Sequence, residues 1–394
     1  MRNFRKLSLV AILGAAAAFV ACGDDDSNVV RLRSDGGAEA SVEGGTEAGS
    51  NTLACGLPIP ATYDSPNFAT NAKAELDLKA NVDALETKMK AAEGTGTAVV
   101  TAAELQALFT AGTPSLRSIA TAAAQATTDA YITEFGAAVG KTWLPADAEA
   151  EGGAPSGGKF ENANIFSAIG VDLREGVLKN LLAGALYNHA LAIAGGPITE
   201  ATIDRLVVVF GATPKLANRT DDDAGAEKDE LVAEYASLRD DKTSTTPGPY
   251  RKIRSALLVA KAAAAGGEKC RADLDGALKI YFLEWERASY LTAIYYLNQA
   301  ATKAQAMPVK GPQALHAFGE AQGFIQSFRG IPQDRRKITD VQIDALLVRV
   351  GAATPYQLLT RTSDRVVAFN TAFNDIGAIF GLTQTQIEDA KKAY

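Results

Sequence analysis

Apolar residues recur at three- and four-residue spacing along most of this 394-residue chain. Leu78, Val82 and Leu85, for example, would fall on one face of a helix. Gly94, a residue type that ends helices well, follows the same segment. Alanine is abundant, and runs of alternating β-branched residues are missing. This pattern predicts an all-α protein made of one or more helical bundles.

The same reasoning places the remaining helices. Thr101 and Glu104 have capping-box spacing, which predicts a helix start, and Pro114 suits the first turn of the next helix. A soft boundary near 150–160 is expected to separate an N-terminal helical part, 55–150, from a C-terminal bundle, 151–394. Further helices are predicted at 172–194, 199–210, 226–239, 249–265, 271–306, 312–328, 339–350, 362–379 and 384–393.

A faint internal repeat relates two of these helices. The segment 198–214 reads ITEATIDRLVVVFGATP, and 338–355 reads ITDVQIDALLVRVGAATP. Each predicts a helix that starts at a capping threonine and stops at a glycine. Two related helical halves would explain the likeness, and so would independent convergence on a good cap, helix and stop.

The first residues have the layout of an export signal. A basic start is followed by an apolar run, 7–20, too short to cross a membrane as a finished helix. The run ends in FVAC, whose cysteine is Cys22, and this resembles the lipobox of bacterial lipoproteins. The resemblance implies a signal peptide at 1–21 and a diacylglycerol or palmitate-type lipid on Cys22.

The stretch after Cys22 explains how the lipid would be used. Residues 22–54 are nearly free of aromatic and large apolar side chains, so we expect a disordered tether. The predicted location is the cell envelope, with the body held on the outer membrane by its lipid anchor and facing the periplasm or the surface.

The net charge of the chain limits the classes of partner that we expect. The net charge is −7 and the isoelectric point is about 5.2, with no basic stripe, so nucleic acid is not an expected partner. Beyond the export signal, no apolar run is long enough to span a membrane. The lipid anchor is therefore the expected membrane contact.

Candidate ligand residues lie in the apolar helices. His316 and Glu320 are four positions apart and share a helix face, which makes them candidate metal ligands. Glu284 and Glu286, which lie among aromatic residues, are further candidates. Imidazole and carboxylate facing each other inside a bundle can hold a metal ion such as iron or zinc. They can equally form a hydrogen-bonded pair that fixes helix register. No residue is assigned a catalytic role.

Cysteine usage predicts one disulfide. If Cys22 carries lipid, Cys55 and Cys270 remain, and an exported chain passes through an oxidising compartment. Both lie at loop-like positions beside glycines. We expect a bridge between them, with two unrelated free thiols as the alternative.

Several segments together resemble a family of bacterial helical lipoproteins of unknown function that is distantly imelysin-like. They are YDSPNF (63–68), EGVLKNLLAGALYNHAL (175–191), WERASYLTAIYYLNQA (285–300), ALHAFGEAQGFIQSF (314–328) and KITDVQIDALL (337–347). The imelysin signature is Gly-x-His-x-x-Glu. Here Gly311 lies five residues before His316, and Glu320 lies four after it.

The resemblance implies an all-helical, surface-anchored protein linked to iron or haem uptake. The leading hypothesis for its function is a non-enzymatic binding lipoprotein of the cell envelope with a role in metal or iron acquisition. An envelope transporter or receptor would be its partner. A metal-assisted hydrolase with Glu320 as general base and a structural or adhesive envelope module are the alternatives.

Overall fold

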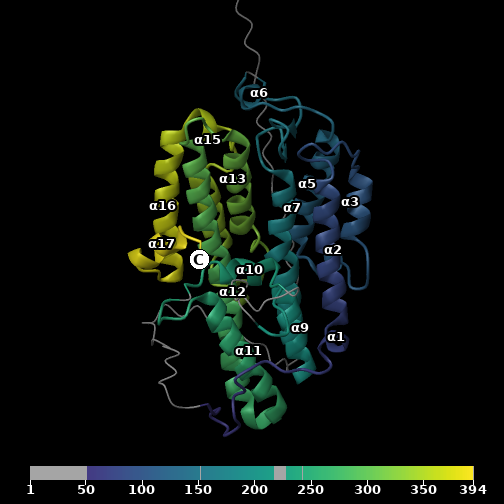
Figure 1. Ribbon diagram of the computed structural model, residues 1–394, viewed down its shortest axis with the longest axis vertical. Helices are drawn as coiled ribbons and strands as arrows, with labels where there is room; N and C mark the ends of the chain where they lie inside the picture. Colours follow the sequence, from purple (N-terminus) through teal and green to yellow (C-terminus); the bar gives the residue numbers. More distant parts are fainter. Residues whose placement is uncertain (1–50, 151, 217–227, 242, 394) are drawn as a thin grey trace, which may run out of the picture.

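The computed structural model describes residues 51–150, 152–216, 228–241 and 243–393. Helices dominate these residues and run along the long axis of the molecule (Figure 1), so the all-α prediction is confirmed. The predicted signal peptide, Cys22 and all but the last few residues of the predicted tether lie outside the described residues.

The first half of the chain contributes one side of the bundle. Its helices are α1 (Phe68–Asn71), α2 (Lys73–Lys90), α3 (Ala102–Phe109), α4 (Leu116–Ile119), α5 (Ala122–Ala138), α6 (Pro145–Glu149), α7 (Leu173–Leu181), the π-helix η1 (Leu182–Tyr187), α8 (Asn188–Ala194) and α9 (Glu200–Phe210).

The second half supplies the centre and the other side. Its helices are α10 (Leu231–Ser237), α11 (Pro249–Gly266), the 3₁₀ turn η3 (Gly267–Cys270), α12 (Arg271–Ala304), α13 (Gly311–Gln326), the 3₁₀ turn η4 (Gln333–Arg335), α14 (Asp340–Val350), α15 (Gln357–Thr360), α16 (Thr362–Phe380) and α17 (Gln384–Ala390).

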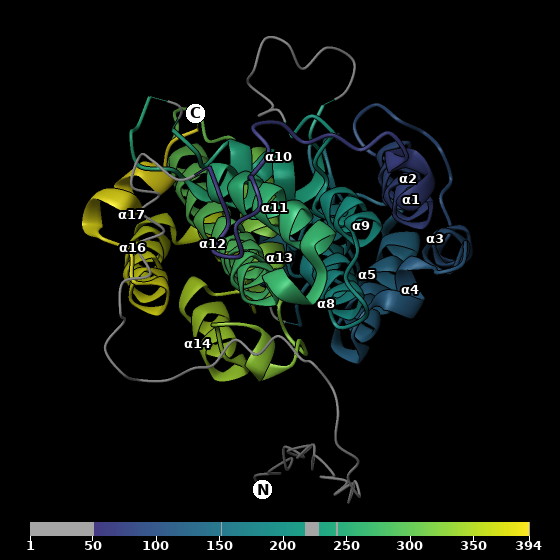
Figure 2. The same ribbon diagram turned by 90° about the horizontal axis from the view of Figure 1, so that it is seen from below.

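The 34-residue helix α12 lies at the centre of the bundle. It packs against α11 and α13, and the end-on view places α2 and α3 on one side and α16 and α17 on the other (Figure 2). One cluster of buried apolar side chains extends from Leu53 to Ala390. Helices on both sides of the boundary expected near 150–160 therefore share this core, and α5 packs directly on α7.

The repeated segments form the predicted cap, helix and stop. Thr199 and Thr339 each accept a hydrogen bond from the third residue of the following helix, α9 or α14. Gly211 and Gly351 end these helices in the left-handed region, with φ of 97° and 76°. Their surroundings differ, because α9 is mostly buried whereas α14 is buried on one side only.

One predicted helix is divided in two. Residues after Pro114 form α4, then an extended Ala120, and then α5 with Thr121 as its N-cap. The backbone N–H of Thr121 donates to the carbonyl of Gly184 in η1, 2.8 Å away. Since this partner belongs to a distant segment, local periodicity could not reveal the break.

The predicted helix 172–194 is continuous but contains the π-helical turn η1. Within that turn, a Cβ added at Gly184 would lie 2.4 Å from the Cβ of Ala124 on α5. Close packing of α5 on this turn therefore requires glycine.

A small sheet was not predicted. Strands β1 (Gly158–Lys159) and β2 (Ile165–Phe166) pair antiparallel, with Gly158 opposite Phe166. They lie in the connection between α6 and α7, at and just after the boundary expected near 150–160.

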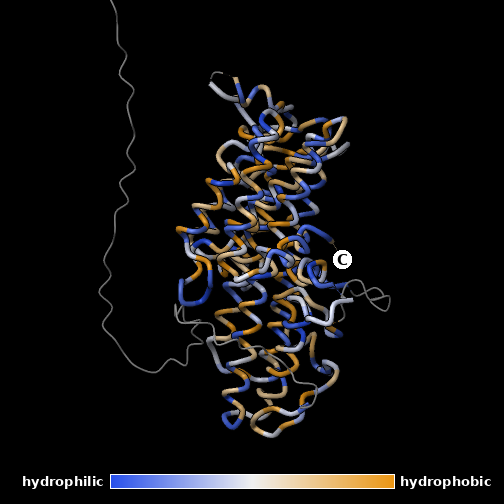
Figure 3. Tube along the Cα trace, turned by 90° about the vertical axis from the view of Figure 1, so that its left-hand side faces the viewer, coloured by the Kyte–Doolittle hydropathy of each residue, from blue (hydrophilic) through white to orange (hydrophobic). Residues whose placement is uncertain are grey.

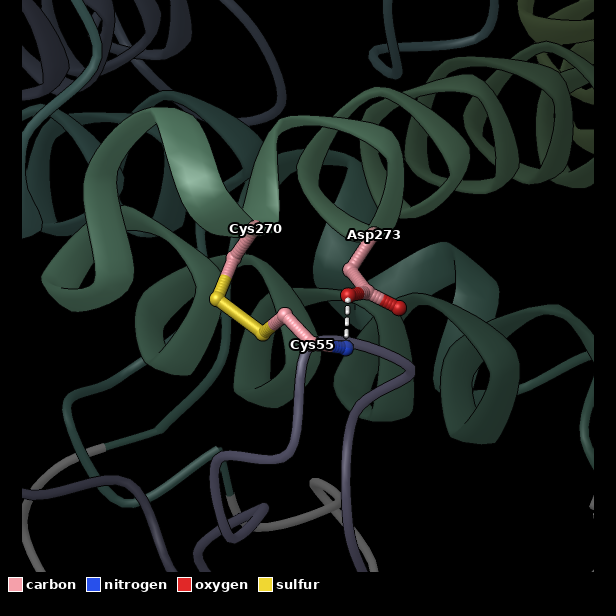
Figure 4. A group of neighbouring side chains, drawn as sticks. All are labelled: Cys55, Cys270 and Asp273. Carbon is pink, nitrogen blue, oxygen red and sulfur yellow. Dashed lines mark hydrogen bonds between the residues drawn. A yellow bond between two sulfur atoms is a disulfide. The ribbon is translucent and has the colours of Figure 1, made fainter.

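Cys55 and Cys270 form the predicted disulfide, with Cα atoms 5.2 Å apart (Figure 4). The carboxylate of Asp273 accepts hydrogen bonds from the backbone N–H groups of Ala54 and Cys55 at 3.0 and 3.1 Å. The first described residues are thereby fixed to the start of α12.

Hydrophobic and hydrophilic residues alternate along the helices within each turn or two (Figure 3). No single helix in the described part is both long and apolar enough to cross a membrane. Taken together, α16 and α17 meet the length and composition criteria, but the two helices are bent by 120° relative to each other.

Candidate functional site

Helices α7 and α13 approach each other closely at two glycines of α13. A Cβ added at Gly319 would lie 2.8 Å from the Cβ of Asp172, and one added at Gly323 would lie 2.5 Å from the Cβ of Lys179. The glycines are four residues apart and share one helix face. They let the polar side chains of both helices meet inside the bundle.

Asp172 begins the site from the N-cap of α7. One carboxylate oxygen accepts from the backbone N–H of Glu175 at 3.1 Å, as an N-cap does. The other lies 2.9 Å from Nδ1 of His316 on α13. The amide nitrogen of Asn164 lies 3.2 Å from the same ring nitrogen. Asp172 is fully buried, whereas 27% of the His316 side chain is exposed, so the site reaches the surface through the imidazole.

Two glutamates complete the acidic side of the site. Glu175 Oε1 lies 3.9 Å from His316 Nδ1, and Glu320 Oε2 lies 3.7 Å from His316 Nε2. Potential ligand atoms of Asp172, Glu175 and His316 all lie within 4.8 Å of one another. The sequence pair His316 and Glu320 is therefore brought together, and the structure adds two carboxylates from α7.

Cationic side chains also enter the cluster. Lys179 Nζ lies 2.8 Å from Glu175, 3.4 Å from Glu320 and 2.6 Å from the hydroxyl of Tyr235. Arg174 pairs with Glu175 at 2.6 Å and with Glu93 at 2.7 Å. These contacts offset much of the cost of burying the carboxylates.

The charges nevertheless do not balance. Asp172, Glu175, Glu320 and Glu93 supply four negative charges when ionised, and Lys179 and Arg174 supply two positive charges. With a neutral imidazole the cluster would carry a net charge of −2. Since uncompensated charge inside a protein is costly, the cluster favours bound protons or a dication.

Protonation of the cluster follows from these surroundings. Burial acts to lower the pKa of His316, but the hydrogen bond and charge of Asp172 outweigh it and raise the pKa to about 9. Burial raises the pKa of Glu320 and of Glu93 above the ordinary glutamate value. Burial would do the same to Glu175, but Lys179 and Arg174 keep its pKa low.

The other histidine has a different environment. His189 Nε2 lies 2.9 Å from Glu75 Oε1, and Arg205 pairs with the same oxygen at 2.7 Å. One carboxylate shared by an imidazole and a guanidinium is a structural arrangement, and it ties α2 to α8 and α9. Among the described residues, this pair does not belong to a cluster of three or more side chains that could hold a metal ion.

Glu284 and Glu286 are committed to other partners. Glu284 lies 3.0 Å from Lys252 Nζ and 3.7 Å from Arg287. Glu286 is fully buried and accepts hydrogen bonds from the backbone N–H groups of Lys337 and Ile338 at 2.7 and 2.8 Å. Among the described residues, neither glutamate belongs to a cluster of three or more side chains that could hold a metal ion. Glu286 instead holds the segment before α14 in place through its two backbone hydrogen bonds.

Sequence reasoning missed Asp172, Glu175 and Lys179. One signal was present: Asp172, Glu175 and Lys179 follow at three- and four-residue spacing at the start of a helix whose every residue is buried. Ionisable side chains on a buried helix need partners from elsewhere in the chain.

Comparisons of this chain with protein-family models, curated proteins and solved structures give no match.

Proposed function

We propose that this protein is a lipid-anchored binding protein of the bacterial cell envelope, without enzymatic activity, and that the cluster around His316 is its metal site. The observation that carries the metal proposal is the convergence of Asp172, Glu175 and His316 from two helices, with ligand atoms within 4.8 Å. The anchor rests on the lipobox-like sequence that ends at Cys22.

The donor set suits a first-row divalent metal. Imidazole nitrogen and carboxylate oxygen both bind zinc and ferrous iron, at about 2.0–2.2 Å for zinc. Atoms on one metal ion are then at most about 4 Å apart. The separations of 2.9 and 3.9 Å from His316 Nδ1 to Asp172 and Glu175 meet this condition. Glu320, at 3.7 Å from the other ring nitrogen, would hold the imidazole in place.

A dication would also satisfy the charge of the site. It would replace the proton between His316 and Asp172 and neutralise a net charge of −2. Iron or zinc presented to a transporter or receptor in the envelope is the role that this proposal favours.

Metal content of the soluble chain tests the proposal. Residues 51–394 contain every described helix and the whole apolar core, so this part carries the fold. After export and purification without chelator, we expect about one zinc or iron ion per chain. His316→Ala should lose it, and His189→Ala should retain it, since His189 pairs with Glu75 and belongs to no cluster of three potential metal ligands among the described residues. Equal metal content in all three folded proteins would contradict the assignment.

One observation favours a second candidate, a metal-assisted hydrolase. Burial raises the pKa of Glu320 to about 7, which suits a general base. Glu320 lies beside Lys179 and only 6% of it is exposed, so access for a substrate is poor. Peptide hydrolysis by the metal-loaded chain that is lost in Glu320→Gln would favour the hydrolase over the binding protein.

A further inference from the structure

Lys179 occupies a position between the two glutamates of the site. Its ammonium lies 2.8 Å from Glu175 on its own helix and 3.4 Å from Glu320 on the facing helix. The side chain is 8% exposed, and the hydroxyl of Tyr235 accepts a further hydrogen bond from it at 2.6 Å. An internal cation is therefore fixed against the carboxylates that a metal ion would use.

We infer that Lys179 is a built-in competitor that weakens metal binding at the His316 site, an inference that rests on the proposed function. Lys179 pairs with Glu175, one of the three expected ligands, so a metal must share or take this carboxylate from the ammonium. Its charge also repels a dication at short range, and this repulsion is strong where water is excluded.

As a consequence, the affinity of the site for a metal ion is limited by the position of Lys179 in the fold. A binding protein that passes its metal to a partner must release it, and a resident ammonium gives the carboxylates a replacement ligand when the metal leaves. The carboxylates of the metal-free cluster then keep a positively charged partner. Without one, the buried negative charges would be uncompensated, which is energetically costly.

A second buried lysine of the described residues offers a matched control. Lys261 Nζ lies 2.9 Å from the fully buried Asp204, and its side chain is 9% exposed. The hydroxyls of Tyr63 and Ser65 also donate to Asp204, so this lysine belongs to a structural network. Within the described residues, the hydrogen bond and ion pair of Lys261 involve Asp204 and no histidine, so Lys261→Met removes a buried charge away from the metal site.

The test is a calorimetric titration of residues 51–394 with Zn²⁺ alone. Lys179→Met should bind about tenfold tighter than the parent, or more, given the loss of a close positive charge. Lys261→Met should bind like the parent. Equal or weaker binding by folded Lys179→Met would overturn the inference while the proposed site stands. Absence of binding by parent and variant alike would overturn both.

Folding of the variant is covered by a second substitution and a second readout. If Lys179→Met folds poorly without metal, Zn²⁺ should restore its cooperative unfolding and raise its melting temperature more than that of the parent. Lys179→Gln keeps length and polarity without the charge, and it should also bind tighter than the parent. Unchanged Zn²⁺ affinity in Lys179→Gln would overturn the inference by itself.

Discussion

At the scale of single residues, His316 differs from an ordinary histidine because a buried carboxylate lies against it. The pKa of His316 is raised to about 9 when folded, against about 6.5 in an unfolded chain. The proton on the folded imidazole therefore contributes stability that is complete below about pH 6.5 and is lost as the pH rises through 9.

Chemical denaturation in the presence of a chelator checks this effect. The unfolding free energy of the parent should fall between pH 6.5 and 9. His316→Gln should lack this part of the decline, and Asp172→Asn should reduce it, since Asp172 causes the rise in pKa. Parallel curves for all three proteins across this pH range would show that the Asp172 contact does not stabilise the imidazolium.

At the scale of helices, the approach of α7 to α13 depends on glycine. Gly323→Ala would place a methyl group 2.5 Å from the Cβ of Lys179, so one helix must shift. We expect a loss of about 1–3 kcal/mol in unfolding free energy, the usual cost of overpacking. Zn²⁺ affinity should fall as well, since the ligands come from both helices.

Gly276→Ala is the control for that prediction. A Cβ at Gly276 would meet nothing within 4 Å, and the residue is exposed within α12. Alanine there should stabilise by roughly 0.5–1 kcal/mol through helix propensity. Denaturation by urea separates the cases, and equal effects of both substitutions would contradict the close approach.

The elements that the sequence predicts well are those with local causes. Helix α9 begins after Thr199 and ends at Gly211, and α14 begins after Thr339 and ends at Gly351. These ends were predictable because threonine capping and the left-handed glycine conformation act within a few residues. His316 and Glu320 share a face for the same reason. The break before α5 was missed because Thr121 bonds to Gly184, far along the chain.

The partners of His316 on α7 could not be predicted either, because they too depend on contacts between distant parts of the chain. His316 could be singled out because histidine is rare here, but its closest partner, Asp172, is 144 residues away in sequence. Which of the many acidic residues faces it depends on the packing of α7 on α13. Helical periodicity gives the buried face of each helix but not the register between two helices.

At the scale of the whole molecule, the disulfide and the candidate site lie far apart along α12. Cys270 lies at the start of this helix, and Tyr296, which hydrogen-bonds with Glu320, lies 25 residues after Arg271. A rise of about 1.5 Å per residue gives roughly 38 Å between them. If the chain is anchored at Cys22, its attachment enters the body at the end away from the metal site.

Loss of the disulfide should destabilise the fold without emptying the site. The bridge links residues 215 apart, and the chain-entropy model gives about 5 kcal/mol as an upper value for such a loop. The double variant Cys55→Ser, Cys270→Ser should therefore melt at lower temperature yet keep its Zn²⁺ affinity. A melting temperature equal to that of the parent would show that the bridge adds no stability.

Membrane attachment is predicted to depend on Cys22. Labelling with a palmitate analogue should mark the parent and not Cys22→Ser, because the thiol is the expected acylation site. The variant should also leave the membrane fraction. Labelling that persists in Cys22→Ser would contradict the lipoprotein assignment and leave the metal site unaffected.

The central claim is a metal ion held between α7 and α13, and anomalous diffraction from crystals of residues 51–394 grown with Zn²⁺ tests it most directly. The account predicts an anomalous peak within about 2.0–2.2 Å of His316 Nδ1 and of carboxylate oxygens from Asp172 and Glu175. An intact hydrogen bond between His316 and Asp172, with no peak beside them, would contradict it.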